Sequence, residues 1–222
     1  AADRDWDGSD QTLSRIRAAG ANRFVSDLAE GNLYQARLQW DKAIAAFERA
    51  AAQNPDAPEP TFALVRIDTR QGKLAQAQNR LANLIAKNPR HQFAHGLLGE
   101  ILILKGDPAG AEAEFRLATG LKPEWSTPWV NWVTLKLSQR KGEEANEILQ
   151  HGLQVNPKNE ELRLLYASHL GDRGQFDLAI TEYETILSQN PRDLMAANNL
   201  AAILTDQKGD TKSLDRALAL SR

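Results

Sequence analysis

Apolar side chains recur along the chain at the spacing of amphipathic helices, and glycine and proline interrupt them at intervals. The clearest run carries five leucine and isoleucine side chains, which are Leu97, Leu98, Ile101, Leu102 and Leu104. A Gly-Asp-Pro sequence then breaks the run. Because a proline in the first turn of a helix loses no hydrogen bond, Pro108 is predicted to begin a second helix. That helix carries Ala111, Phe115 and Ala118 on one face and is predicted to end before Pro123, since proline disfavours helical geometry in the preceding residue.

The same helix pair recurs with a period of 34 residues. Prolines mark the period at Pro55, Pro89, Pro123, Pro157 and Pro191. Alanines keep the same interval, each twelve residues before its proline, at Ala43, Ala77, Ala111, Ala145 and Ala179. Two interlocked series without slippage indicate tandem repeats. Each repeat is predicted to be a helix, a tight turn, a second helix and a turn marked by proline.

Small and large side chains take complementary places in the repeats. The alanines of the series lie early in the second helix, where a larger side chain would hold the paired helices apart. The matching small residues of the first helix are Gly31, Gly99, Ala167 and Ala201. Large side chains are predicted to fill the space between helices, at Tyr34, Phe47, Phe115, Trp129, Trp132 and Tyr183. This alternation lets antiparallel helices interlock densely, and each pair must stack on the next to bury its second face.

On these residues the chain resembles the tetratricopeptide repeat (TPR) family. The first full repeat supplies Gly31, Tyr34, Ala43, Phe47, Ala50 and Pro55, and the third supplies Leu98, Gly99, Gly106, Ala111, Phe115, Ala118 and Pro123. The fourth departs from the family motif, with Arg140 at the turn glycine and Gly152 at the later alanine. The resemblance implies an all-α fold, a right-handed α-solenoid of antiparallel helix pairs.

The period divides the chain into an N-terminal segment and six repeats. Residues 1–23 are predicted to form either the second helix of a preceding partial repeat or an N-terminal capping helix. The repeats are expected at residues 24–57, 58–91, 92–125, 126–159, 160–193 and, truncated, 194–222. In the sixth repeat the pattern slips by one residue at Lys208-Gly209-Asp210. Because the last leucines do not resemble a polar cap, we expect the chain to be a piece of a longer array.

The resemblance also implies a concave groove, lined by the first helices, that receives a peptide or a segment of a partner protein. Carried over by position, the groove residues are Asn32, Gln35, Glu59, Phe62, Arg66, Arg70, Phe93, Glu100, Ile103, Val130, Thr134, Leu137, Leu164 and Ser168. We expect an apolar groove with a polar entrance at Arg66 and Arg70, because a row of exposed apolar side chains is unusual without a partner. The alternative is that Phe62, Phe93 and Val130 seal neighbouring repeats.

A known specialisation of the family grips the C-terminal carboxylate of a chaperone with Lys, Asn and Arg side chains. The corresponding positions here hold Leu28, Asn32, Ala63, Phe93 and Leu97. Only Asn32 fits that pattern, so the sequence argues against this activity.

Composition narrows the function further. The chain has 222 residues and a formal net charge of −2, which lacks the basic excess of a nucleic-acid binder. No stretch approaches the roughly 18 uninterrupted apolar residues of a membrane-spanning helix. Cysteine is absent, so disulfides and thiolate sites are excluded. No signal peptide is visible, although Ala1-Ala2 is compatible with a cleaved one, so the sequence does not distinguish periplasm from cytoplasm.

Candidate catalytic and metal-binding patterns are weak. His91 and His95 have the four-residue spacing of two zinc ligands, but no third ligand is patterned nearby, and a capping or solvent-facing histidine is favoured. The glycines near Pro108 lack the Gly-Lys-Ser/Thr ending of a phosphate-binding loop. The sequence therefore predicts no catalytic residues, no metal and no cofactor. The acidic pairs Glu112/Glu114 and Glu143/Glu144 are interpreted as solvated helix faces.

Tryptophan is frequent for a chain of this length, with five residues. Trp129 and Trp132 lie three residues apart, with Trp125 in the preceding turn. Packing in the core accounts for one of them, and an exposed cluster that binds a partner is an alternative for the others.

The leading prediction is a non-enzymatic scaffold that binds a protein or peptide partner. The segment Asn198-Asn199-Leu200-Ala201 is similar to bacterial TPR arrays of envelope assembly, exopolysaccharide export or exosortase systems. One alternative is the regulatory or substrate-docking arm of a larger enzyme, and another is an RNA-binding helical repeat. Self-association through uncapped ends is a further expectation.

Overall fold

A computed structural model describes residues 22–55, 57–208 and 211–220. These residues form twelve α-helices and one π-helical turn, and no strand occurs among them. The predicted all-α repeat fold is therefore confirmed. The chain divides into two compact units, residues 1–107 and 108–222, and each is described by itself. The predicted segment 1–23 lies, apart from residues 22 and 23, outside the described residues.

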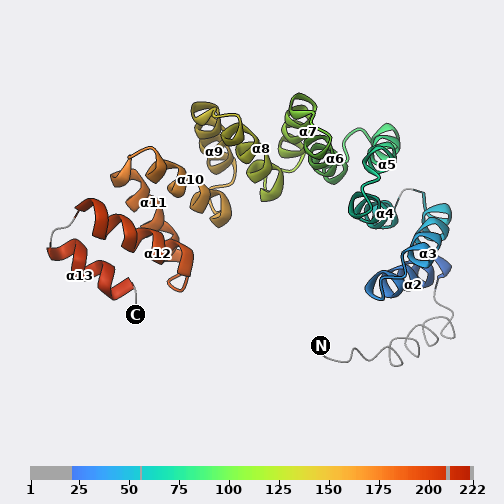
Figure 1. Ribbon diagram of the computed structural model, residues 1–222, viewed down its shortest axis with the longest axis horizontal. Helices are drawn as coiled ribbons and strands as arrows, with labels where there is room; N and C mark the ends of the chain where they lie inside the picture. The colour runs from blue at the N-terminus through green and yellow to red at the C-terminus, as the bar shows by residue number, and fades with distance from the viewer. Residues whose placement is uncertain (1–21, 56, 209–210, 221–222) are drawn as a thin grey trace. The chain divides into compact units, whose positions relative to one another are not determined.

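The described part of the first unit consists of five helices, each packed against the next along the chain (Figure 1). They are α2 (Arg23–Ala36), α3 (Trp40–Gln53), α4 (Pro58–Arg70), α5 (Leu74–Lys87) and α6 (Gln92–Leu104). The core between α2, α3 and α4 is formed by Ala43, Phe47, Ala63, Leu64 and Ile67.

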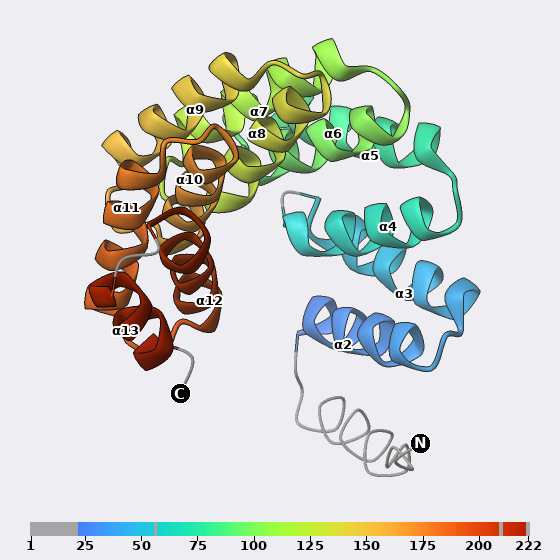
Figure 2. The ribbon, with the colours of Figure 1, turned by 60° about the vertical axis from the view of Figure 1, so that its left-hand side comes forward.

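The second unit continues the alternation of first and second helices. It contains α7 (Pro108–Leu121), α8 (Ser126–Ser138), α9 (Gly142–Val155), α10 (Glu160–Asp172), α11 (Phe176–Gln189), α12 (Leu194–Ile203), η1 (Leu204–Lys208) and α13 (Thr211–Leu220). As predicted, α7 begins at Pro108. Figure 2 shows α10, α11, α12 and α13 packed side by side, and a core that includes Leu170, Tyr183 and Leu200 lies among them.

A residue with left-handed backbone geometry lies between the first and the second helix in each of the first five repeats. The φ angles are 73°, 77° and 72° at Gly72, Gly106 and Gly174. The same repeat position is occupied by Leu38 and Arg140, each with φ 60°. A side chain makes this geometry unfavourable, so these two turns are strained where the other three are relaxed. The turn at Arg140 therefore differs from the family motif in residue type but keeps the same backbone geometry.

The start of the first helix shows a second periodic feature. Helix caps fall 34 residues apart at Ala57, His91, Trp125, Asn159 and Asp193. Three of these side chains accept a hydrogen bond from the backbone N–H three residues later: His91 Nδ1 from Ala94, and the Oδ1 atoms of Asn159 and Asp193. A cap of this kind satisfies one of the N–H groups that a helix leaves unpaired at its start. His91 is therefore a capping residue, which is one of the two roles that the sequence analysis favoured over zinc binding.

Three of the prolines that mark the repeat period are hydrogen-bonded to the first helix that follows them. The carbonyl oxygens of Pro89, Pro123 and Pro157 accept hydrogen bonds from His95 Nε2, Trp129 Nε1 and a guanidinium nitrogen of Arg163, at 3.0, 3.0 and 2.6 Å. The three donors are 34 residues apart. Different side chains thus perform the same task, because the position needs a donor and not a particular residue.

Close approach within the first helix pair depends on Gly31. A β-carbon added there would lie 2.5 Å from a ring carbon of Phe47, whose side chain is fully buried. The ring packs directly against the backbone of α2, so the predicted pairing of a small residue with a large one is confirmed in this repeat.

The one-residue slip in the sixth repeat coincides with η1. A π-helical turn accommodates one residue more than an α-helical turn. The extra residue is therefore absorbed at the end of the first helix, and α13 begins at Thr211, one residue before the expected Lys212.

Candidate functional site

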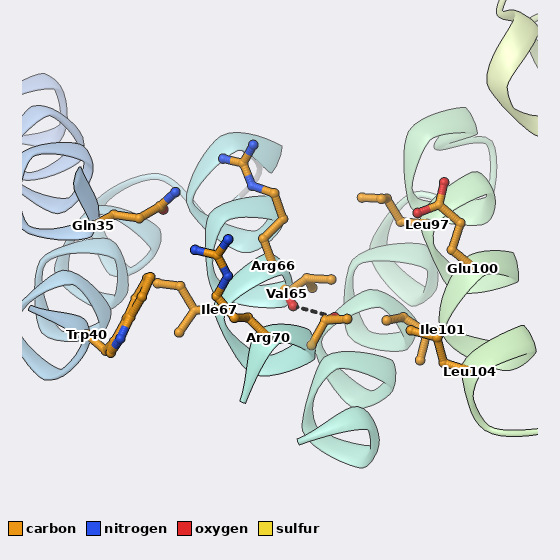
Figure 3. Close-up of a pocket in the computed structure, with 11 residues that line it drawn as sticks. Gln35, Trp40, Val65, Arg66, Ile67, Arg70, Leu97, Glu100, Ile101 and Leu104 are labelled. Atoms are coloured by element: carbon orange, nitrogen blue, oxygen red, sulfur yellow. Dashed lines mark hydrogen bonds between the residues drawn. The ribbon is translucent and has the colours of Figure 1, made fainter. Parts of the chain in front are cut away.

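A recess of about 420 Å³ lies on the first-helix face of the first unit. We call it the arginine recess and define it by its lining residues, Gln35, Trp40, Val65, Arg66, Ile67, Thr69, Arg70, Leu97, Glu100, Ile101 and Leu104. They come from α2, the start of α3, α4 and α6. Figure 3 shows the arginine side chains extending from α4 towards Gln35, and Leu97 and Ile101 extending from α6 towards α4.

Four of the groove residues predicted from the sequence line this recess: Gln35, Arg66, Arg70 and Glu100. The sequence reasoning missed Trp40, Leu97 and Leu104. Leu97 and Leu104 belong to the apolar run of α6, which by itself predicts a helix and does not show which of its side chains reach the surface. Leu104 is 58% exposed, which a residue devoted to the core would not be.

The two arginines of α4 present unsatisfied positive charge. Both are exposed, and neither forms an ion pair with another described residue. The guanidinium carbon of Arg70 lies 5.5 Å from the centroid of the Trp40 ring, within the range of a cation–π contact. Stacking occupies the face of the guanidinium group and leaves its N–H edge free. That edge matches the two oxygens of a carboxylate.

Gln35 adds a neutral polar group to the recess. Its Oε1 atom is buried and has no hydrogen-bond partner among the described residues. A buried acceptor without a partner is costly, because the oxygen has lost water and gained nothing in exchange.

Phe62 and Phe93, by contrast, do not line the recess. They form an edge-to-face cluster with His91, with ring centroids 5.5 Å apart for Phe62 and His91 and 6.5 Å for Phe62 and Phe93. This cluster joins α4 to the start of α6 and supports the alternative in which these phenylalanines seal neighbouring repeats. Burial lowers the pKa of His91 below its ordinary value of 6.5, which keeps the capping nitrogen unprotonated.

The remaining predicted groove residues are dispersed. Asn32, Glu59 and Ile103 are exposed and lie outside the lining of the recess. In the second unit, Val130, Leu137, Leu164 and Ser168 are half-buried and Thr134 is exposed. Leu164 packs against the core of that unit, and Ser168 hydrogen-bonds Tyr183. A binding role for these residues stays a prediction.

A second recess, of about 330 Å³, lies in the second unit among α7, α8 and α9. We call it the lysine recess; its lining residues are Glu112, Arg116, Trp132, Lys136, Glu144, Glu147, Ile148 and His151. Lys136 is 3% exposed, and its Nζ atom lies 2.7 Å from Glu112 and 2.6 Å from Glu144. Arg116 pairs with Glu112 at 3.4 Å and lies over the Trp132 ring.

Glu112 and Glu144, interpreted from the sequence as members of solvated faces, are partly exposed and in addition bind the buried Lys136. Burial by itself lowers the pKa of Lys136, but hydrogen bonds to both glutamates outweigh burial and raise it. Burial likewise raises the pKa of Glu112, and Lys136 overcomes this effect so that the net pKa is lowered. The three groups hold one another in their charged forms.

Trp132 and Trp129 are buried as well, and their rings stack with centroids 6.2 Å apart. An exposed partner-binding cluster built on these two side chains is thus excluded. They pack in the core because α8, the helix that carries both, is covered by α9.

The histidine pair with the spacing of zinc ligands lies at the start of α6. No group of three or more His, Cys, Asp or Glu side chains in the part of the chain that the structure describes could hold a metal ion. His91 caps α6 and His95 donates to a proline carbonyl, so both have structural roles. Among the described residues, none of the helices has both the length and the apolar content to cross a membrane.

An array of helix pairs with a 34-residue period defines a helical-repeat protein that presents surfaces to partners. Two sequence models described as tetratricopeptide repeat match the chain, one over residues 62–124 and the other over residues 28–89 and 136–204. The chain therefore belongs to the tetratricopeptide repeat family, and it is in general terms a protein–protein interaction scaffold.

Individual relatives are more distant. The BBSome complex member BBS4 of Bos taurus is 31% identical over 111 residues, which are 50% of this chain and 21% of that protein. A thermophilic TPR protein of Thermus thermophilus is 24% identical, with a TM-score of 0.57 over 82% of this chain and 99% of the other. YrrB, described as a TPR protein with an unusual peptide-binding site, is 19% identical, with a TM-score of 0.55 over 80% of this chain and 93% of the other. The two structures share the fold.

Proposed function

We propose that this chain binds an extended segment of a partner protein in the arginine recess. The observation that carries the proposal is the recess itself, where two exposed arginines without ion-pair partners among the described residues lie beside exposed and half-buried leucines. Accessible apolar side chains grouped in a recess beside arginines are typical of a surface that binds a partner.

The family supports this proposal at a general level. TPR proteins bind protein partners, and YrrB is described as having a peptide-binding site. Of the fourteen groove residues predicted from the sequence, we propose four as the binding site, Gln35, Arg66, Arg70 and Glu100, because they line one recess.

A peptide-display selection against the whole chain tests the proposal. Peptides of random sequence are selected on the wild-type protein and then measured on Leu97→Ala and Leu104→Glu, which alter the recess. Leu178→Glu, on the 54% exposed Leu178 of α11, is the matched control outside it. We expect the two recess variants to weaken binding about tenfold, the effect of losing one buried leucine contact, and the control to leave it unchanged. Selected peptides that bind all variants equally would exclude the recess.

The pathway is proposed on the sequence alone. The resemblance of Asn198–Ala201 to bacterial TPR arrays supports a role in assembling an envelope or polysaccharide-export complex. Fractionation of cells that express the native protein tests this, because the role requires association with the envelope fraction. Self-association through the ends of the array stays a prediction, which sedimentation velocity checks.

A further inference from the structure

The chemistry of the partner segment can be inferred from the arginine recess, and the inference rests on the proposed function above. We infer that the recess selects an extended internal segment in which acidic and aliphatic side chains alternate. The acidic side chains would pair with Arg66 and Arg70 of α4, and the aliphatic side chains would pack on Leu97, Ile101 and Leu104 of α6.

The spacing of the arginines matches alternate residues of a strand. Arg66 and Arg70 are four residues apart on α4, which places them roughly 6 Å apart along the helix axis at 1.5 Å per residue. Alternate residues of an extended chain point to the same side and are roughly 6.7 Å apart. Two carboxylates at positions i and i+2 of a strand that runs along α4 would therefore meet the two guanidinium groups in turn.

The opposite wall of the recess is suited to the intervening residues. Leu97, Ile101 and Leu104 recur at i, i+4 and i+7 on α6, so they form a stripe along that helix, with Glu100 beside it; Leu97 and Leu104 supply its accessible surface. Figure 3 shows Leu97 and Ile101 extending towards α4. A strand between the two helices sends successive side chains to opposite sides, so every second residue would face this stripe.

Both arginines lie open at the surface on one helix face, which suits side-chain carboxylates of a segment that passes through the recess. Trp40 holds Arg70 by its face, so less conformational freedom is lost when the edge of the guanidinium group binds. The positive charges of Arg66 and Arg70 thus have no ion-pair partner among the described residues, and the guanidinium group of Arg70 is already held in place.

Three end-blocked peptides of equal length test the inference. The first is acetyl-Ser-Asp-Leu-Asp-Leu-Ser-amide, the second has the same composition in the order Asp-Asp-Leu-Leu, and the third replaces both aspartates by asparagine. Their binding to the whole chain is measured by isothermal titration. The alternating peptide is expected to bind about tenfold more tightly than the Asp-Asp-Leu-Leu peptide, which loses one charge-assisted hydrogen bond, and about a hundredfold more tightly than the asparagine peptide, which loses two. A fourth peptide, with the alternating order and a free C-terminal carboxylate, should bind like the first.

Charge variants locate the effect. Arg66→Gln and Arg70→Gln should each weaken the alternating peptide about tenfold and leave the asparagine peptide unchanged. Arg90→Gln is the matched control, because it removes an exposed arginine of the first unit outside the recess. Thermal melting of all three variants should match that of the wild type, since none of these side chains is buried.

The inference is overturned if order makes no difference, if the asparagine peptide binds as well as the acidic one, or if Arg90→Gln has the same effect as the recess variants. Tighter binding of the free-carboxylate peptide would also contradict it, because the ligand would then be a chain end. These results can be told apart from a failure of the proposed function, in which selected peptides would bind the recess variants as well as the wild type. Display-selected peptides that depend on Leu104 but carry no acidic residue would refute the inference alone.

Discussion

The two recesses differ in how their charges are satisfied. In the arginine recess, Arg66 and Arg70 form no ion pair with a described residue, and the neighbouring leucines are partly exposed. In the lysine recess, Lys136 is held by two glutamates, and Arg116 is paired and stacked on Trp132. The missing internal partners of Arg66 and Arg70 are the reason why we propose the arginine recess as the binding site, whereas the charges of the lysine recess are paired within the unit.

The comparison extends to a single repeat position. Asp68 and Lys136 lie two periods apart and are both buried, yet they carry opposite charges. Asp68 pairs with Arg80 at 2.8 Å, and Lys136 pairs with Glu112 and Glu144. The position tolerates either sign because a neighbouring helix supplies the opposite one. Burial of a charge here depends on pairing and not on the repeat motif.

Removing the buried lysine is expected to have the largest effect. Lys136→Met leaves Glu112 and Glu144 with only their more exposed partners Arg116 and Lys141, and we expect a loss of about 2–4 kcal/mol in the free energy of unfolding, because two charge-assisted hydrogen bonds are lost. Arg66→Met, the matched change in the arginine recess, should cost less than about 0.5 kcal/mol. Urea denaturation followed by circular dichroism measures both. Equal losses would mean that the two recesses do not differ in the way described.

The second largest effect is expected from a methyl group added at Gly31, where α2 and α3 approach each other closely. Gly31→Ala places a β-carbon 2.5 Å from the buried Phe47 ring, and we expect a loss of about 1–3 kcal/mol from overpacking. Gly152→Ala in the second unit meets Leu162 at 3.0 Å, so its cost should be smaller. Gly120→Ala, with no atom within 4 Å, should stabilise by about 0.5–1 kcal/mol. The reverse order in thermal melting would contradict the packing described for α2 and α3.

The strained turns offer a gain of stability in each unit. Leu38→Gly and Arg140→Gly should each raise the free energy of unfolding by about 0.5–1 kcal/mol, because glycine adopts the left-handed geometry without a steric penalty. Arg140→Ala is the control, since alanine keeps the β-carbon and should bring no such gain. A melting temperature that rises equally for Arg140→Ala and Arg140→Gly would show that backbone strain is not the cause.

The smallest effect concerns pH and belongs to the first unit. Because the pKa of His91 is lowered in the folded state, the stability it contributes is present above 6.5 and is lost as pH falls through the lowered value. His91→Asn supplies a non-titrating cap like Asn159. Between pH 7.5 and pH 5 the wild type should lose up to about 1 kcal/mol more than this variant, the worth of one capping bond. Parallel pH profiles in denaturation experiments would exclude the linkage.

Much of the local structure followed from residue type. Pro108 marks the start of α7, His91 caps α6, and Arg140 lies at a turn that retains the geometry of the glycine it replaces. Trp129 and Trp132 were harder to place, since their spacing is compatible with an exposed cluster as well as with the core. Only the packing of α9 against α8 shows that both rings are covered.

By itself the sequence determined the helices, their period and the small-to-large pairing between them, because these depend on backbone sterics and on contacts within a few residues. The tertiary structure alone decided which charges meet. Glu112 and Lys136 are 24 residues apart on different helices, and no local pattern marks them as a pair. The same holds for the arginine recess, whose walls come from helices separated along the chain. Pairing at that range depends on how helices dock, and docking is set by the packing of the whole unit.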